Sequence, residues 1–297
     1  METRPYLILV ATKIYKANGR HVTESIRTEK LKNNTPDEQL TSETLNVVAF
    51  KGKRPSIVML HGLGGTTRYW SSVMDFSKQE YDVQLIDLLG FGDSPKPFRR
   101  YTMEMHLQAL EPMLEDKQDF IMVGHSLGAV IALAYAARFP QKVKRLVLIG
   151  MPYFDDISSA RSWFRGRASG WIYTNYLAVI LTCMFTRRIA VVFLPYLIKG
   201  YPREVVQDLV KHNVMSSTTS LWNVVYKHDP RLDCEQLPSS LDVYCIHSQD
   251  DDVAPVENLS RLATDYEWSL LRLNGYRHHV WLHNPKRCWR VICSGSI

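Results

Sequence analysis

The sequence has no apolar run long enough to cross a membrane and no closely spaced pair of cysteines. A membrane-spanning helix needs about 20 mostly apolar residues. The nearest candidate, residues 176–198, is interrupted by Arg187, Arg188 and Pro195. The five cysteines are odd in number and form no C-x-x-C pair, which predicts reduced thiols in a cytoplasmic compartment. Cysteine and histidine show no metal-ligand spacing, so neither a metal nor another cofactor is expected.

The sequence also has little excess of one charge. Its 36 basic and 30 acidic side chains leave a net charge of +6, which by itself is no nucleic-acid signature, and no nucleic-acid partner is predicted. Hydrophobic residues make up 45% and charged residues 22%, a globular composition that excludes a disordered or collagen-like chain. A chain of 297 residues suits one large domain with an insertion.

Residues 1–44 form a polar N-terminal extension. The apolar stretch Tyr6–Ala11 is too short for most signal peptides, and no small-residue cleavage site follows it. Lys13, Lys16 and Arg20 come next. This mixture of apolar and basic residues favours a short amphipathic helix, which we expect to cover an edge of the sheet.

Beyond the extension, short apolar runs alternate with helical patterns. The runs of strand length are Leu45–Phe50, Ser56–Leu60, Val83–Ile86, Phe120–Val123, Arg145–Ile149, Leu241–Ile246 and Trp268–Leu273. Helical periodicity is clearest at Leu127–Phe139 and Val256–Ala263. The alternation predicts the α/β class, with a doubly wound, mostly parallel sheet formed by residues 45–150 and 236–297. Residues 151–235 carry helical periodicity without a clear strand, and we expect them to form an inserted helical cap.

One motif carries strong chemical information. Gly124-x-Ser126-x-Gly128 follows an apolar strand and precedes an Ala-rich helix. A serine on a strained strand-to-helix turn is lifted above the sheet, and the tight packing of the turn requires glycine on both sides. The context therefore predicts Ser126 as a nucleophile.

A serine nucleophile needs a base and a group that orients the base. Candidate acids, Asp250, Asp251 and Asp252, follow one predicted strand, and the candidate bases His278 and His279 follow the last. Active sites of open α/β sheets assemble at the carboxyl ends of the strands, so these groups are expected to meet Ser126 there.

Acyl transfer also needs hydrogen-bond donors for an oxyanion. The backbone N–H of Leu127 directly follows the proposed nucleophile. The Gly-rich segment 60–65 follows another predicted strand, and the Leu63 N–H can supply a second donor.

Together these motifs resemble the α/β-hydrolase superfamily, in particular its small capped esterases, lipases and carbon–carbon bond hydrolases. Four motifs agree in order: His61-Gly62-x-Gly64, the segment 87–94, Gly124–Gly128, and the acid and histidine pair. The resemblance implies an α/β-hydrolase fold, a structural role for the segment 87–94, and places for His61, Gly62 and His125 in the wall of the pocket.

The resemblance also selects among the candidate acids and bases. The family's acid stands four positions before a proline, and Pro255 then points to Asp251, with Asp250 and Asp252 as alternatives. Its histidine stands about seven positions before a proline, and Pro285 points to His278, with His279 as the alternative. Lesser candidate bases are His61, His125, His247 and His283. Asp155 and Asp156 are remote alternatives for the acid. The family's sizeable C-terminal helix is expected to be shortened here to about two turns, Lys286–Cys293.

The predicted cap is basic and aromatic. From Ile157 to Arg203 there are seven basic residues, nine aromatic residues and no acid. These side chains either form a packed core with a solvated basic face, or make a peripheral contact with an anionic membrane or another partner. Aliphatic residues of such a cap can also line a pocket for acyl chains.

We therefore expect a serine hydrolase that cleaves an apolar carboxylic ester, for example a lipid or fatty-acyl ester. Catalysis is assigned to Ser126, Asp251 and His278, with the Leu63 and Leu127 amides binding the oxyanion. One alternative is a carbon–carbon bond hydrolase with the same triad, which needs a basic pocket for its substrate carboxylate. The other is a non-catalytic ligand-binding or receptor-like module of this fold. The sequence leaves the oligomeric state open.

Overall fold

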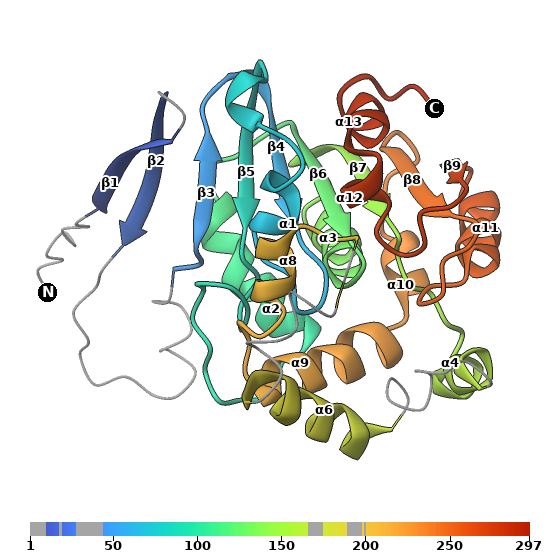
Figure 1. Cartoon of the computed structure of the whole chain (residues 1–297). Coiled ribbons are helices and arrows are strands. Elements are labelled where there is room, and N and C mark those ends of the chain that lie inside the picture. Colours follow the sequence, from blue (N-terminus) through green and yellow to red (C-terminus); the bar gives the residue numbers. More distant parts are fainter. Residues whose placement is uncertain (1–9, 18–19, 28–43, 166–174, 189–197, 199) are drawn as a thin grey trace, which may run out of the picture.

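The computed structural model describes residues 10–17, 20–27, 44–165, 175–188, 198 and 200–297. Within these residues, nine strands form one sheet in the order β1-β2-β3-β5-β4-β6-β7-β8-β9 (Figure 1). The six strands from β5 to β9 are parallel, and β1, β2 and β3 extend the sheet with antiparallel pairs. The predicted doubly wound, mostly parallel sheet is thus confirmed.

The strands lie where the apolar runs predicted them. Their bounds are β3 Val47–Phe50, β4 Lys53–Leu60, β5 Tyr81–Ile86, β6 Phe120–His125, β7 Val143–Ile149, β8 Asp242–Ser248 and β9 Ser269–Leu273. Central strands are apolar throughout because both faces of the sheet are covered. In β4, Ile57 and Met59 pack into one core, and Val58 and Leu60 pack into the other.

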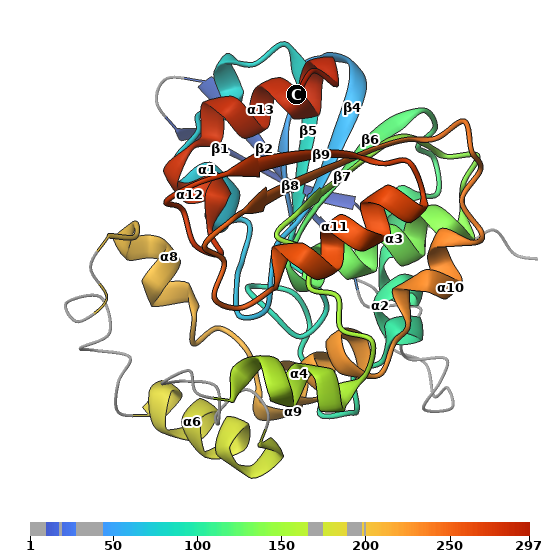
Figure 2. The same cartoon turned by 90° about the vertical axis from the view of Figure 1, so that its right-hand side faces the viewer.

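Two layers of helices cover the sheet (Figure 2). The helices of the two layers are α2 Met103–Leu110, α3 Leu127–Arg138, α10 Pro230–Cys234 and α11 Val256–Asp265 on one face, and α1 Arg68–Ser71, α12 Val280–His283 and α13 Pro285–Ser294 on the other. Three short turns of 3-10 or π-helix are Phe76–Lys78, Glu111–Leu114 and Leu221–Tyr226. Helix α13 has ten residues, two more than predicted, and it buries Trp289, Val291 and Ile292 in the core.

The chain between β7 and β8 is helical where the structure describes it. Its helices are α4 Ile157–Phe164, α6 Tyr176–Arg188, α8 Arg203–Asp208 and α9 Val214–Ser220, followed by the π-helical turn and α10. Helices α4, α6 and α9 lie beyond the carboxyl ends of the parallel strands in both views (Figures 1 and 2). The predicted cap boundaries, 151 and 235, stay a prediction. No described helix is long and apolar enough to cross a membrane, and residues 189–197 of the candidate stretch lie outside the described residues.

The prediction of a helix in the N-terminal extension was wrong. The described part of residues 1–44 forms an antiparallel hairpin of β1 Val10–Ala17 and β2 Arg20–Arg27, which joins the sheet beside β3. The prediction relied on apolar and basic composition, whereas β2 pairs with the open edge of β3, and such backbone pairing at a sheet edge is a tertiary effect.

Candidate active site

Ser126 lies on a strained turn between β6 and α3. Its backbone has φ 52° and ψ −118°, a region that non-glycine residues seldom adopt. A Cβ on Gly124 would lie 2.5 Å from Ala129 Cα, and one on Gly128 would lie 2.5 Å from the His61 carbonyl oxygen. Both positions therefore exclude side chains, as the G-x-S-x-G motif predicted.

Three side chains from separate segments form a continuous hydrogen-bond chain. The Ser126 hydroxyl donates to His278 Nε2 at 2.8 Å. His278 Nδ1–H donates to Asp251 Oδ2 at 2.8 Å, with Oδ1 at 3.1 Å. All three residues are buried. A hydroxyl, an imidazole and a carboxylate in this order can pass the hydroxyl proton to the imidazole while the carboxylate holds the ring.

Asp251 is held as an anion by its surroundings. Burial alone would raise the pKa of this carboxyl, but the charges and hydrogen bonds of His278 and His247 keep the pKa well below its usual value. The Val253 and Ala254 N–H groups also donate to Oδ1, each at 2.8 Å. The acceptor that orients His278 is therefore fixed and stays charged.

The neighbouring acids have other partners. Asp250 is exposed and accepts from the Ser248 hydroxyl at 2.6 Å and the Gly275 N–H at 2.9 Å, so it ties the loop before His278 to β8. Asp252 is exposed.

The remote alternatives for the acid lie elsewhere. Asp155 accepts from the Tyr153 hydroxyl at 3.0 Å, and Asp156 caps the N-terminus of α4. Of the five acids considered from sequence, Asp251 is the one within hydrogen-bond reach of His278.

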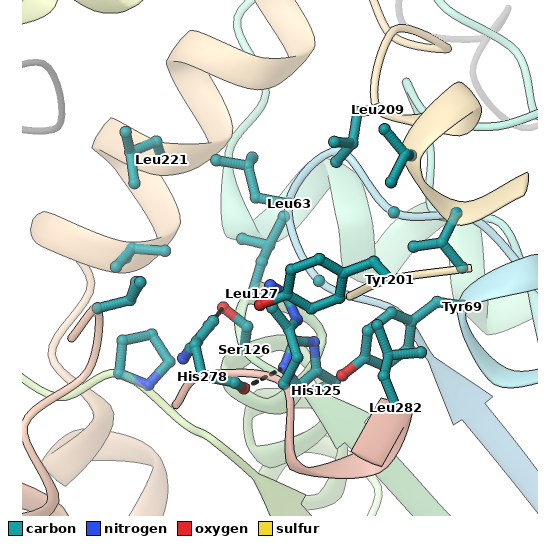
Figure 3. Close-up of a pocket in the computed structure, with 18 of the residues that line it drawn as sticks. Leu63, Tyr69, His125, Ser126, Leu127, Tyr201, Leu209, Leu221, His278 and Leu282 are labelled. Carbon is teal, nitrogen blue, oxygen red and sulfur yellow. Dashed lines mark hydrogen bonds between the residues drawn. The ribbon is translucent and has the colours of Figure 1, made fainter. Parts of the chain in front are cut away.

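The histidines next to Ser126 and His278 have different surroundings. His125 Nε2–H donates to the His278 carbonyl oxygen at 3.1 Å, and its ring stacks on Tyr69 with the centroids 4.5 Å apart (Figure 3). Burial lowers the pKa of His125 well below its usual value. Burial and the charge of His278 lower the pKa of His279 to about 3. Both rings are therefore neutral at pH 7, and the Ser126 hydroxyl is bonded to His278.

The remaining histidines lie away from the Ser126 hydroxyl. His247 Nε2 lies 2.8 Å from the Ala254 carbonyl oxygen and 3.2 Å from Asp251 Oδ2. His283 is exposed.

The expected place of His61 in the pocket wall was wrong. It is not among the residues that line the described cavity, whereas Gly62 and His125 are. His61 Nδ1–H donates to the Gly62 carbonyl oxygen at 2.8 Å, and Nε2 accepts from the Leu88 N–H at 3.0 Å. The ring thus lies behind the cavity and joins the loops that follow β4 and β5.

Hydrogen bonds hold the segment 87–94 against neighbouring loops. Asp87 is buried and accepts from the Thr67 N–H at 2.6 Å and the Asn46 amide at 2.8 Å. Ser94 donates from its hydroxyl to the Asp87 carbonyl oxygen at 2.5 Å. These bonds fix the chain behind the Gly-rich loop.

Two residues beside Ser126 combine a place in the cavity lining with a backbone N–H that is unpaired within the described part of the chain. Leu63 and Leu127 both line the cavity, and neither N–H has an acceptor among the described residues. Leu127 is the first residue of α3, whose leading N–H groups have no intrahelical acceptor. The helix N-terminus also favours negative charge at this position.

A cavity of about 320 Å³ opens above Ser126 (Figure 3). Half of its described lining residues, all of them apolar or aromatic, come from the chain between β7 and β8, and the described lining contains no Lys, Arg, Asp or Glu. Lining residues that sequence reasoning missed include Tyr69, Phe154, Phe164, Tyr201, Val205, Val206, Leu209, Leu221, Val225, Tyr226, Val253 and Leu282. Their apolar character was visible in the sequence, but nothing there showed which of them face Ser126.

Asp208 is a buried carboxylate that the sequence did not single out. It ends α8 and accepts from the Thr66 hydroxyl at 2.5 Å, from Arg68 Nε at 2.6 Å and from Arg68 Nη2. Lys211 Nζ lies 3.4 Å away. This ion pair joins α8 to α1 and the chain that continues the Gly-rich loop, next to the cavity. Sequence reasoning missed this ion pair because Asp208 and Arg68 are 140 positions apart in the chain.

No group of three or more His, Cys, Asp or Glu residues in the described part of the chain could hold a metal ion. The four cysteines whose side chains are described, Cys234, Cys245, Cys288 and Cys293, are free thiols.

Known proteins resemble this chain in sequence and in structure. A family model described as the alpha/beta hydrolase fold matches residues 55–182. The Arabidopsis thaliana protein named Probable lysophospholipase BODYGUARD 2 is 35% identical over 113 residues, which cover 35% of this chain and 24% of that protein. The chain therefore matches only about a quarter of that relative's length.

Solved structures are similar over most of the chain. A hydrolase from Pseudomonas aeruginosa has a TM-score of 0.65 at 17% identity and covers 84% of this chain and 95% of its own. An esterase from Exiguobacterium antarcticum has the same TM-score, identity and coverage. At such low identity these similarities concern the fold.

Proposed function

The chain belongs to the α/β-hydrolase superfamily, and we propose that it is a serine hydrolase that cleaves an apolar carboxylic ester. The observation that carries this proposal is the hydrogen-bond chain from Ser126 through His278 to Asp251 at the floor of an apolar cavity. The esterase among the structural neighbours and the lysophospholipase name of a partial relative are consistent with it.

The mechanism follows from the positions of these groups. Ser126 Oγ attacks the acyl carbon while His278 Nε2 takes its proton, and Asp251 stabilises the imidazolium that forms. The Leu63 and Leu127 N–H groups donate to the oxyanion, an effect worth about 3 kcal/mol per donor in other serine hydrolases. His278 then protonates the departing alcohol. A water molecule, deprotonated by His278, releases the acid from the acyl-enzyme.

The cavity lining favours an uncharged acyl group. A carbon–carbon bond hydrolase acting on a keto acid needs a cation for the substrate carboxylate, and the described lining offers neither Lys nor Arg. The walls instead provide Phe154, Phe164 and Leu221, which suit an alkyl chain. We therefore place a medium or long acyl chain in this space and the ester carbonyl at Ser126.

Two assays test the proposal. One is labelling with a fluorophosphonate probe, and the other is hydrolysis of p-nitrophenyl esters of increasing chain length. Wild type should label and turn over, whereas Ser126→Ala should do neither. The matched control Ser269→Ala removes an exposed hydroxyl of β9 and should behave as wild type. Labelling that persists in Ser126→Ala would refute the nucleophile. Binding of esters without turnover by wild type would identify a non-catalytic module instead, and activity confined to acetyl esters would exclude the lipid-like substrate.

A further inference from the structure

Helix α6 exposes a continuous apolar face. Leu177, Leu181, Met184 and Phe185 expose 62, 55, 52 and 56% of their surface. Their spacing of i, i+4, i+7 and i+8 places them on one side of a helix. Single exposed apolar residues are ordinary, but four on one helix face mark an interaction surface. We call these four residues the α6 face.

Other residues of α6 attach the helix to the protein. Ala178 is buried, Val179 packs against the apolar cluster that contains Phe154 and Phe164, and the helix packs beside α9. Both views place α6 at the outer end of the molecule, on the far side of α9 from the sheet (Figures 1 and 2). The α6 face is therefore presented outward by a helix that is anchored through its other residues.

The sequence that contains this face is basic, which favours a negatively charged partner. The segment 157–203 contains seven basic residues and no acid, and Arg161 and Arg165 of the neighbouring α4 region are exposed. A second copy of the chain would bring two segments of the same positive charge together, which opposes self-association. An anionic lipid surface instead attracts the basic residues and takes up the apolar ones.

We propose that the α6 face is a peripheral membrane-docking surface that inserts its apolar side chains among anionic lipids. The helix lies along the surface, with its apolar side chains in the boundary between headgroups and acyl chains. The turn that follows α9 supplies Leu221 to the cavity wall, so docking brings the cavity side of the molecule toward the bilayer. This inference does not depend on the reaction that takes place at Ser126.

Co-sedimentation with phosphatidylcholine vesicles, with or without phosphatidylglycerol, tests the proposal. Wild type should bind the vesicles that contain phosphatidylglycerol, and added salt should weaken the binding because it screens the basic residues. Leu181→Glu should weaken binding at least about tenfold, since it removes an inserted leucine and adds a repelled charge. Leu232→Glu is the matched control, because Leu232 is 60% exposed and its helix, α10, lies away from α6 in both views.

The outcomes separate the alternatives. Binding lost in Leu181→Glu and kept in Leu232→Glu supports the α6 face. An absence of wild-type binding to either vesicle, or equal loss in both variants, overturns it. Sedimentation velocity without lipid gives a further outcome: self-association that Leu181→Glu abolishes, together with no vesicle binding, would identify the face as a contact between copies of this chain.

Discussion

At the scale of single residues, Asp251 and its two neighbours show how position decides the role of a side chain. All three are aspartates in one short run, yet Asp251 is buried against His278 while Asp250 and Asp252 are exposed. Two backbone N–H groups and two imidazoles surround the Asp251 carboxylate. The ring that Asp251 orients is the ring bonded to Ser126.

Replacing Asp251 with asparagine should therefore impair the reaction strongly. The amide cannot hold the imidazole in the tautomer that accepts the serine proton, and kcat should fall by about 10⁴-fold, as in other triads. Asp252→Asn is the control and should stay within about twofold of wild type, because its carboxylate is exposed. Steady-state kinetics on a p-nitrophenyl ester measure both. Equal effects of the two substitutions would remove Asp251 from the mechanism.

A second residue-scale prediction concerns acid stability. His106 is buried, its Nε2 lies 3.0 Å from the Ser220 hydroxyl, and burial lowers its pKa from 6.5 to about 3. Below pH 6.5 the unfolded chain binds a proton that the folded chain does not, so stability falls as pH falls from about 6.5 toward 3. From about pH 7 to about pH 5 this one histidine should account for a loss of about 2 kcal/mol.

Urea unfolding at both pH values measures that loss. His106→Gln should show a smaller difference between the two free energies of unfolding than wild type, whatever its absolute stability. His283→Gln removes an exposed histidine and should keep the wild-type difference. An unchanged pH difference in His106→Gln would show that His106 titrates normally in the folded protein.

At the scale of elements, the chain after β7 is joined to the core by the buried carboxylate at the end of α8. Helix α8 supplies Val205 and Val206 to the cavity wall, and Leu209 follows it there. Thr66 and Arg68 hold Asp208 from the other side. The position of this wall thus depends on an ion pair, because α8 is too short to be stable alone.

Asp208→Ala should loosen this junction. It leaves Arg68 and the Thr66 hydroxyl without their acceptor and should lower the free energy of unfolding by about 3 kcal/mol. The KM for long-chain esters should rise more than the KM for acetyl esters, because we expect the displaced wall to contact the distal part of a long acyl group and not an acetyl group. Asp93→Ala is the control: this exposed carboxylate lies 3.3 Å from Lys211 and should change stability by less than about 1 kcal/mol. Equal destabilisation by both variants would contradict the role of Asp208.

At the scale of the whole molecule, the basic sequence of the segment 157–203 contrasts with the uncharged described lining of the cavity. The net charge of +6 is matched by seven basic residues of the segment 157–203, which has no acid. The described cavity lining carries no Lys, Arg, Asp or Glu. Long-range electrostatics should therefore act on charged surfaces that meet the protein, and hardly on a neutral ester that enters the cavity.

Ionic strength should reveal this contrast. For a neutral, soluble p-nitrophenyl ester, kcat/KM should change by less than about twofold between about 0.05 M and about 0.5 M NaCl, because the described cavity lining has no charged side chain for the salt to screen. Stopped assays on wild type at fixed pH measure this directly. A steep fall with salt would show that a charged residue takes part in binding the substrate.

The sequence by itself determined the sheet, the strained turn and the order of the reactive residues. Continuous apolar runs specify strands that are buried on both faces, and Gly124 and Gly128 are required wherever Ser126 sits on such a turn. The choice of Asp251 and His278 came from the resemblance to a family, and in the structure both side chains lie in one hydrogen-bond chain with Ser126. These features are local, so a short window of residues contains the physical cause.

Tertiary structure alone decided the rest. The hairpin of β1 and β2 depends on pairing with β3, the contact of Asp208 with Arg68 spans 140 positions, and the place of His61 behind the cavity depends on Leu88. The same holds for the α6 face, since amphipathic composition does not tell which side of a helix is covered. Such contacts join segments that are distant in the chain, and their energies come from packing and burial that arise only when the chain has folded.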